Sequence, residues 1–334
     1  HNSYRRNEGD ALAILFHCPW DNADAWLAAL QHDLPHDEFR IWPDLDGPDG
    51  DASDIDFAFV WKLPHGVLAS LPNLVGIASL GAGVDALLGD PDLPRDVPIT
   101  RLVDPLMTDR MAEYVTATVL HHHLGLDVYD RQGAEKQWQR NRTTDAPDRT
   151  VALFGLGQMG ERCAQRLRAL GFDLVGWSRT AKEISGVHCL HGAEGFEEAL
   201  AAAEIAVLLL PLTAETENLM NAAAFAAMPQ GAYVINCSRG EVVVNEDLIA
   251  ALDSAQPNSR QPNGGHLAGA TLDAFAVEPL APDSPLWTHP KIRITPHIAA
   301  LSAAATAAPI LAAQVRRARD GEAMHDVVNV DGGY

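Results

Sequence analysis

The sequence predicts an α/β protein of two domains, each built on a parallel sheet. Short apolar segments of strand length alternate with segments of helical length twice along the chain, first within residues 1–110 and again from Thr150 onward. Such alternation favours parallel strands joined by helical crossovers. The length of 334 residues is enough for two separate hydrophobic cores.

In the first series we expect strands at 11–18, 57–61, 75–80 and 99–102, because each is a short apolar run. Residues 22–32 predict a helix with an apolar face. Residues 107–136 predict one long helix or a broken pair. Within it, His121, His122 and His123 are consecutive and cannot share one helical face. Packing or interface roles are therefore favoured for them, and no metal is expected.

The second series predicts strands at 151–154, 173–177, 205–210, 233–236, 270–275 and 292–295, with a helix at 161–170. Strands in this number with intervening helices indicate a doubly wound, Rossmann-like sheet. The alanine-rich segment 302–320 is expected to form a helix that returns to the first domain. The expected domains are therefore 1–110 with 303–334, and 111–302.

The charge is strongly acidic, with 24 basic and 45 acidic residues and a net charge of −21. This field repels phosphate backbones and anionic membranes, so neither nucleic acid nor membrane is expected as a partner. No apolar run approaches the roughly 20 residues of a membrane helix. The scattered cysteines Cys18, Cys163, Cys189 and Cys237 favour a reduced cytoplasm. The acidic excess fits either a salt-adapted protein or an ordinary acidic enzyme.

A glycine fingerprint follows the apolar segment 151–154 and opens a helical segment. Gly155 permits a tight turn, Gly157 lets the backbone approach a pyrophosphate, and Gly160 allows close packing of helix and strand. An anion then lies at a helix amino terminus. This context predicts a dinucleotide site.

The end of the next strand indicates which dinucleotide binds. A site for NAD usually places an acidic residue here against the ribose hydroxyls. The sequence instead has Trp177, Ser178, Arg179 and Thr180, with Lys182 nearby. A guanidinium suits a 2′-phosphate, so NADPH is expected to be preferred, with NADH possible.

Three further motifs follow in order and contain Arg239, Glu278 and His297. A cation, a carboxylate and an imidazole downstream of a dinucleotide loop suit hydride transfer to a 2-keto acid, because the cation binds the anionic substrate and the imidazole moves a proton. A small anionic 2-keto acid is therefore the expected substrate.

Taken together, the motifs resemble the D-isomer-specific 2-hydroxyacid dehydrogenase family, closest to its glyoxylate/hydroxypyruvate reductase A branch. The resemblance covers nearly the whole chain and rests on VWKLP at 60–64, LGAGVD at 80–85, EYV at 113–115, WSRT at 177–180, NCSRG at 236–240, SPLW at 284–287 and TPH at 295–297. It implies NADPH-dependent reduction of glyoxylate to glycolate and of hydroxypyruvate to D-glycerate. The active site would lie in a cleft between a substrate-binding and a dinucleotide-binding domain.

The resemblance also implies residue roles. Arg239 would bind the substrate carboxylate and polarise the keto oxygen, His297 would act as general acid, and Glu278 would fix its tautomer. The other implied substrate contacts are Trp61, Gly81, Ala82 and Gly83. The implied cofactor contacts are Gly155, Gly157, Gln158, Met159, Gly160, Trp177, Ser178, Arg179, Thr180, Lys182, Leu210, Pro211, Thr216, Cys237, Ser238, Asp273, Ala299 and Ala300. A homodimer is implied, with 107–136 as its arm. Trp138 is the candidate to reach a neighbouring subunit's site, although packing at the interface is the favoured role for this residue.

Two departures from the family pattern leave questions open. The spacing from Arg239 to Glu278 is long, and the extra residues fall in a Pro-, Gly- and Asn-rich segment at 254–266. This segment is expected to be a mobile loop at the sheet edge away from catalysis. Lys62 stands where close relatives often carry His, so a bulkier 2-keto acid remains an alternative substrate. A nucleotide-sensing corepressor is a remote alternative of another class.

Overall fold

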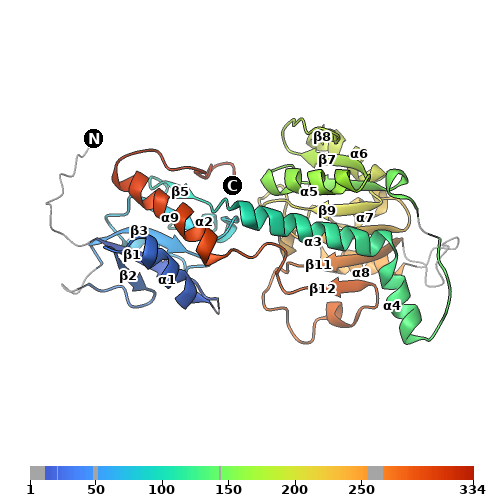
Figure 1. Ribbon diagram of the computed structural model, residues 1–334, viewed down its shortest axis with the longest axis horizontal. Coiled ribbons are helices and arrows are strands. Elements are labelled where there is room, and N and C mark those ends of the chain that lie inside the picture. Colours follow the sequence, from blue (N-terminus) through green and yellow to red (C-terminus); the bar gives the residue numbers. More distant parts are fainter. Residues whose placement is uncertain (1–11, 21, 48–51, 143, 255–265) are drawn as a thin grey trace. The chain divides into compact units, whose positions relative to one another are not determined.

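The computed structural model describes residues 12–20, 22–47, 52–142, 144–254 and 266–334. The chain forms two compact units (Figure 1). Unit 1 comprises the chain up to Met107 together with Ser302–Tyr334, and unit 2 is Thr108–Leu301. Each unit is built on one sheet whose strands pair in parallel, which confirms the predicted fold class.

Unit 1 contains a five-stranded sheet in the order β2-β1-β3-β4-β5. Its strands are β1 (Ala13–His17), β2 (Glu38–Ile41), β3 (Ile55–Val60), β4 (Gly76–Ser79) and β5 (Ile99–Thr100). Its helices are α1 (Ala23–Asp33), the 3-10 turn η1 (Leu68–Ser70), α2 (Asp85–Leu88) and α9 (Ala304–Arg319). The sequence prediction missed β2, because charged residues interrupt its short apolar run. The edge strand β2 nevertheless buries Arg40, whose Nη1 donates to Asp54 Oδ1 over 2.8 Å.

The central strands of unit 1 are buried on both faces, as every residue of β3 and β4 is buried. Continuous apolar strands are typical of a parallel sheet covered on both sides. Helix α9 packs against α1, and its last residue, Arg319, donates to both oxygens of the buried Asp56 of β3 over 2.9 and 2.8 Å. The chain's last helix is therefore anchored in the core of unit 1.

Unit 2 contains a seven-stranded sheet in the order β12-β11-β10-β9-β6-β7-β8. Its strands are β6 (Thr150–Phe154), β7 (Asp173–Ser178), β8 (His188–His191), β9 (Ile205–Leu208), β10 (Ala232–Asn236), β11 (Leu267–Leu272) and β12 (Ile292–Ile294). Its helices are α4 (Leu126–Ala134), α5 (Gln158–Ala169), α6 (Gly192–Ala202), α7 (Ala222–Ala227) and α8 (Asn245–Asp253), with 3-10 turns η2 (Ala146–Asp148), η3 (Gly240–Val242) and η4 (Pro285–Thr288). The prediction of six strands was wrong by one, because the partly exposed edge strand β8 begins and ends with histidine.

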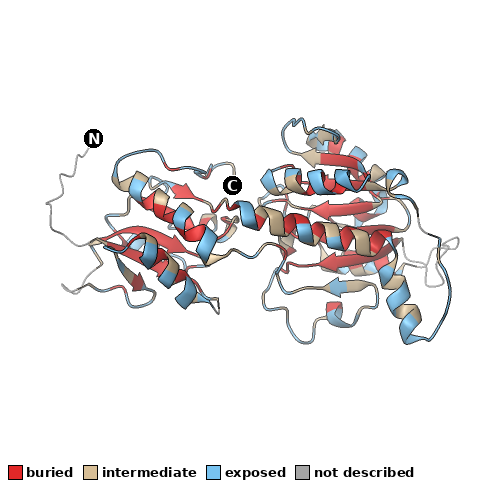
Figure 2. Ribbon diagram, viewed as in Figure 1, coloured by how far each residue is buried: buried red, intermediate tan, exposed pale blue. Residues whose placement is uncertain are grey.

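The region 107–136 is a broken helix pair, formed by α3 (Pro105–His123) and α4. The break falls at Gly125, whose φ of 64° is left-handed backbone that favours glycine. Within unit 2, Met111, Val115 and Val119 of α3 are buried against the sheet, whereas α4 has no buried residue (Figure 2).

The strand order of unit 2 reverses between β6 and β9, because the chain adds β7 and β8 on one side of β6 and the later strands on the other. Ligands of such sheets bind beyond the carboxyl ends of the strands at this reversal. The glycine loop and the Arg239, Glu278 and His297 motifs all follow such strand ends.

The predicted loop at 254–266 falls mostly outside the described residues, which resume at His266. Its described flanks meet at the amino end of β11, where the His266 N–H donates to Ser254 Oγ over 3.0 Å. That end of the strand is opposite the carboxyl edge. Among the helices of the described chain, none is long and apolar enough to cross a membrane.

Candidate active site

The glycine loop joins β6 to α5 with little room for side chains. A Cβ on Gly155, whose φ is 110°, would lie 2.5 Å from the Leu209 carbonyl oxygen, and one on Gly160 would collide with the Gly155 carbonyl. A Cβ on Gly157 would instead meet no atom within 4 Å. The space over the amino end of α5 is therefore open, and no side chain caps this helix. The loop fits a dinucleotide pyrophosphate.

The end of β7 presents cations and hydroxyls but no acid. Arg179, Thr180 and Lys182 are exposed, and the Ser178 hydroxyl donates to the Thr180 carbonyl over 2.8 Å. The pKa of Glu215 is lowered, first by a hydrogen bond with Thr213 and in smaller part by the charge of Arg179. The carboxylate of Glu215 therefore already lies within electrostatic reach of Arg179.

The loop after β9 is stabilised by its own side chains. Thr216 is buried, and its hydroxyl donates to the Pro211 carbonyl over 2.7 Å while the Thr213 N–H donates to it over 2.8 Å. Leu210 is also buried. Thr216 therefore stabilises this loop from within.

The turn after β10 holds Arg239 through its neighbours. Asn236 donates from Nδ2 to the Arg239 carbonyl over 2.8 Å, and its Oδ1 accepts from both the N–H and the hydroxyl of Ser238. The Arg239 Nη1 donates to the Ser238 carbonyl over 2.9 Å. Burial raises the pKa of the Cys237 thiol well above its usual range, so this residue is an inert part of the turn.

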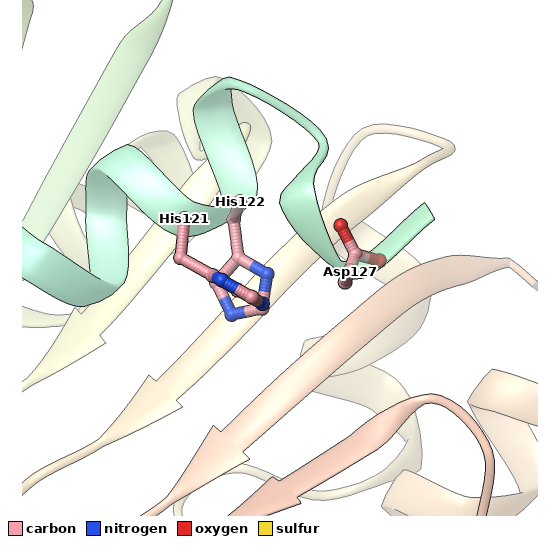
Figure 3. Close-up of side chains that lie close together, drawn as sticks. All are labelled: His121, His122 and Asp127. Carbon is pink, nitrogen blue, oxygen red and sulfur yellow. The ribbon is translucent and has the colours of Figure 1, made fainter. Parts of the chain in front are cut away.

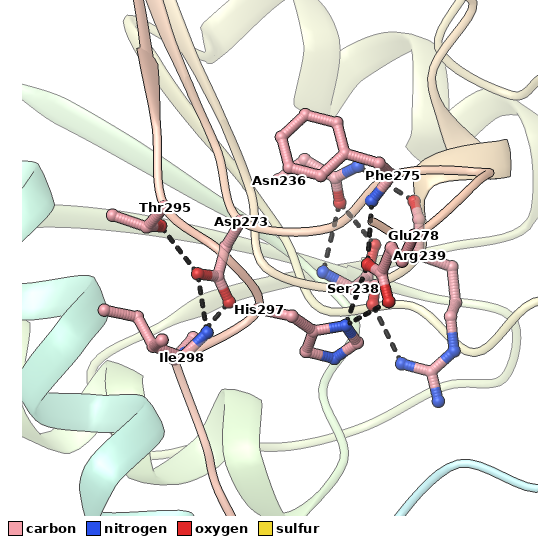
Figure 4. Close-up of polar contacts among 10 residues, drawn as sticks. Asn236, Ser238, Arg239, Asp273, Phe275, Glu278, Thr295, His297 and Ile298 are labelled. Carbon is pink, nitrogen blue, oxygen red and sulfur yellow. Dashed lines mark hydrogen bonds and ion pairs between the residues drawn. The ribbon is translucent and has the colours of Figure 1, made fainter. Parts of the chain in front are cut away.

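Glu278 and His297 form a hydrogen-bonded pair (Figure 4). The Nδ1 atom of His297 lies 2.9 Å from Oε1 and 3.0 Å from Oε2 of Glu278, and the Phe275 N–H donates to Oε1 over 3.1 Å. Because an ionised carboxylate only accepts hydrogen bonds, Nδ1 carries the proton and donates a hydrogen bond to Glu278. The Nε2 atom of His297 is then the atom that can exchange a proton with a substrate.

Asp273 fixes the loop that carries His297. Its Oδ1 accepts from the Thr295 hydroxyl over 2.6 Å and from the Ile298 N–H over 2.9 Å, and its Oδ2 accepts from the Ala299 N–H over 2.9 Å. These bonds hold His297 in left-handed backbone with φ 55°. The sequence predicted a cofactor contact for Asp273, and the structure adds this anchoring role.

Tyr114 and Thr295 are supporting residues that sequence reasoning missed. The Tyr114 hydroxyl on α3 lies 2.6 Å from the Thr295 hydroxyl, and burial raises the pKa of this tyrosine. The two residues lie in the EYV and TPH motifs, but their pairing depends on α3 crossing the sheet. They connect α3 through Asp273 to the His297 loop.

In unit 1, the predicted substrate contacts lie together after β3 and β4. The Gly81 backbone packs on the ring of Trp61, which is 5.0 Å from Trp20 between ring centroids. The Gly81 N–H donates to Ser79 Oγ, and Ser79 Oγ donates to the Gly83 carbonyl over 2.9 Å. Ala82 is partly exposed at the turn. Trp138, in unit 2, is 99% exposed.

Comparisons with known proteins agree with this arrangement. The family described as D-isomer specific 2-hydroxyacid dehydrogenase, NAD binding domain, matches residues 116–299. A glyoxylate/hydroxypyruvate reductase A of Serratia proteamaculans is 37% identical and covers 97% of this chain and 100% of its own length.

Two solved structures are similar throughout. A D-isomer specific 2-hydroxyacid dehydrogenase of Xanthobacter autotrophicus Py2 in complex with NADPH and MES is 43% identical, with a TM-score of 0.88 over 97% of this chain and all of that one. An NADPH-dependent glyoxylate/hydroxypyruvate reductase of Sinorhizobium meliloti in complex with NADP and sulfate is 34% identical, with a TM-score of 0.87 over the same shares. The chain therefore belongs to the D-isomer specific 2-hydroxyacid dehydrogenase family, in its glyoxylate/hydroxypyruvate reductase A branch, and is an NAD(P)-dependent oxidoreductase.

Proposed function

We propose that this protein reduces small 2-keto acids with NADPH, converting glyoxylate to glycolate and hydroxypyruvate to D-glycerate. The observation that carries the proposal is the pairing of His297 Nδ1 with both oxygens of Glu278 at the carboxyl edge of the sheet of unit 2. A carboxylate on one ring nitrogen leaves the other available to a substrate, which is the arrangement a general acid requires.

In this mechanism, His297 delivers the proton on Nε2 to the keto oxygen. Glu278 accepts the hydrogen bond from Nδ1, so it fixes the tautomer and stabilises the charged imidazolium before transfer. The guanidinium of Arg239 binds the substrate carboxylate and polarises the keto oxygen, because its planar fork suits two parallel hydrogen bonds. Trp61 and Gly81–Gly83 are retained as proposed substrate contacts of unit 1.

NADPH, when bound, would supply the hydride for reduction of the keto carbon. The glycine loop and the amino end of α5 would hold its pyrophosphate, since this space is open above Gly157. The remaining proposed contacts are Gln158, Met159, Trp177, Ser178, Thr180, Leu210, Pro211, Thr216, Cys237, Ser238, Asp273, Ala299 and Ala300. Unit 2 is thus the proposed dinucleotide-binding domain and unit 1 the proposed substrate-binding domain.

Preference for NADPH over NADH rests on the exposed cations Arg179 and Lys182 after β7. A 2′-phosphate gains charge-assisted hydrogen bonds from a guanidinium, whereas a free ribose hydroxyl gains little. The relatives crystallised with NADPH or NADP support the same preference. We also propose that the protein forms a homodimer. We further propose that it resides in a reduced cytoplasm, which is supported by its four free cysteines.

A steady-state panel tests the proposal. Glyoxylate, hydroxypyruvate, pyruvate and phenylpyruvate are each assayed with NADPH and with NADH. The highest kcat/KM is expected for the first two acids with NADPH. Highest activity with phenylpyruvate would instead favour the alternative of a bulkier 2-keto acid, and no turnover of glyoxylate or hydroxypyruvate would refute the proposal.

A further inference from the structure

Two histidines at the end of α3 and an aspartate in the first turn of α4 converge in unit 2 (Figure 3). His121, His122 and Asp127 each offer one ligand atom, and these atoms all lie within 4.8 Å of one another. Adjacent residues of one helix do not normally share a face. The cluster exists because the left-handed Gly125 reverses the chain and returns Asp127 to the histidines.

Two polar atoms of this cluster, one on His122 and one on Asp127, are buried without a hydrogen-bond partner among the described residues. His122 is 3% exposed, and within the described part of the chain its Nδ1 has no hydrogen-bond partner. The same holds for Oδ1 of Asp127. An unpaired buried polar atom destabilises the fold, so it needs a physical reason.

The surroundings of His122 orient the ring toward the cluster. Its Nε2 lies 2.9 Å from Thr271 Oγ1, and the ring stacks on Tyr233 with centroids 4.4 Å apart. When Nε2 donates to Thr271, Nδ1 keeps a lone pair. A metal-binding histidine is commonly held in this way, with its second nitrogen hydrogen-bonded to the protein.

We propose that His121, His122 and Asp127 bind one divalent transition-metal ion of the zinc type. Imidazole nitrogens and a carboxylate oxygen are ligands that Zn²⁺ accepts, whereas Mg²⁺ and Ca²⁺ prefer all-oxygen sites. Solvent would complete the coordination. The ion would join the end of α3 to α4, which has no buried residue of its own to hold it.

Some charged residues near this cluster weaken its affinity for a metal cation, and others strengthen it. Arg293 is exposed, and its Nη1 lies 3.4 and 3.5 Å from the two ring nitrogens of His121, so it opposes a cation there. Arg131 pairs with the other oxygen of Asp127 over 3.3 Å, while Asp130 lies near enough to favour positive charge at His121. Removal of the Arg293 charge should therefore tighten metal binding.

Zinc titration of the full chain tests this site. The protein is prepared without a polyhistidine tag, stripped with a chelator and titrated with zinc chloride by calorimetry. One saturable site is expected. Asp127→Asn and His121→Gln should each weaken zinc affinity by roughly 10–100-fold or more. Losses of roughly that size follow even when residues that only hydrogen-bond to a metal ligand are removed. Arg293→Gln should strengthen it.

The matched control is His188→Gln, which removes an exposed histidine 3.5 Å from Glu198 and should leave affinity unchanged. Folding of each variant is checked by thermal unfolding without metal, and zinc should raise Tm for the wild type but not for Asp127→Asn. Absence of a saturable site, or equal affinity in the wild type, Asp127→Asn and His121→Gln, would overturn the proposal. Loss of binding in Glu278→Gln alone would also overturn it, because zinc would then occupy the His297 pair.

Discussion

Substitution of Glu278 by Gln isolates the charge of the carboxylate that contacts His297. The amide keeps an oxygen that can accept from His297 Nδ1 and from the Phe275 N–H, which lie 2.9 and 3.1 Å from Oε1. The shape and the hydrogen bonds to this oxygen can therefore persist, whereas the 3.0 Å contact of Nδ1 with the second carboxylate oxygen is lost, because an amide NH2 group only donates. The substitution also removes the negative charge that, in the proposed mechanism, stabilises the protonated imidazole before it transfers its proton.

The geometry sets the size of the expected effect. The charges are about 3 Å apart, and the side chains of His297 and Glu278 are 37% and 21% exposed, so solvent screens the pair partly. With an effective dielectric constant of about 40–80, the attraction is roughly 1.4–2.8 kcal/mol. Since about 1.4 kcal/mol corresponds to a factor of ten, kcat/KM should fall roughly 10–100-fold.

The assay is steady-state reduction of glyoxylate with saturating NADPH, accompanied by a direct measurement of NADPH affinity. The loss should appear in kcat/KM for glyoxylate while the Kd for NADPH stays unchanged. Glu198→Gln removes the acid of the exposed His188 pair and is the matched control, with no expected effect. Full activity of Glu278→Gln, or an equal loss in NADPH affinity, would refute the role given to the carboxylate.

Three further perturbations test other parts of the molecule. Arg179→Glu should raise KM at least tenfold more for NADPH than for NADH, and equal changes would contradict the assignment of the 2′-phosphate site. Asp273→Asn should lower stability in urea by about 2–4 kcal/mol and reduce kcat, because an amide cannot accept all the hydrogen bonds made by this carboxylate; an unchanged unfolding midpoint would argue against an anchor. Arg319→Met should cost about 3–5 kcal/mol, because it removes both hydrogen bonds of the guanidinium to the buried Asp56 and its ion pair with Asp37. Arg317→Met, whose partner Glu322 is exposed, should cost about 0–1 kcal/mol, and similar losses in the two variants would contradict the prediction.

The fold class and the order of the functional motifs along the chain could be predicted from the amino-acid sequence alone. The glycine loop, Arg239 and His297 each follow an apolar segment of strand length, and parallel strands place such segments' carboxyl ends at one edge. These signals are local, so they can be recognised in the amino-acid sequence alone. The edge strands β2 and β8 escaped prediction because their polar residues match no simple apolar run.

The contacts between side chains that are distant in sequence could not be predicted and became visible only in the folded chain. Asp273 supports the His297 loop from the end of β11. Tyr114 reaches Thr295 because α3 packs near the end of β12. His122 and Asp127 converge only because the chain turns at Gly125. Periodicity records which face of an element is apolar, but it does not contain the backbone reversals and crossings that bring polar groups from separate elements into contact.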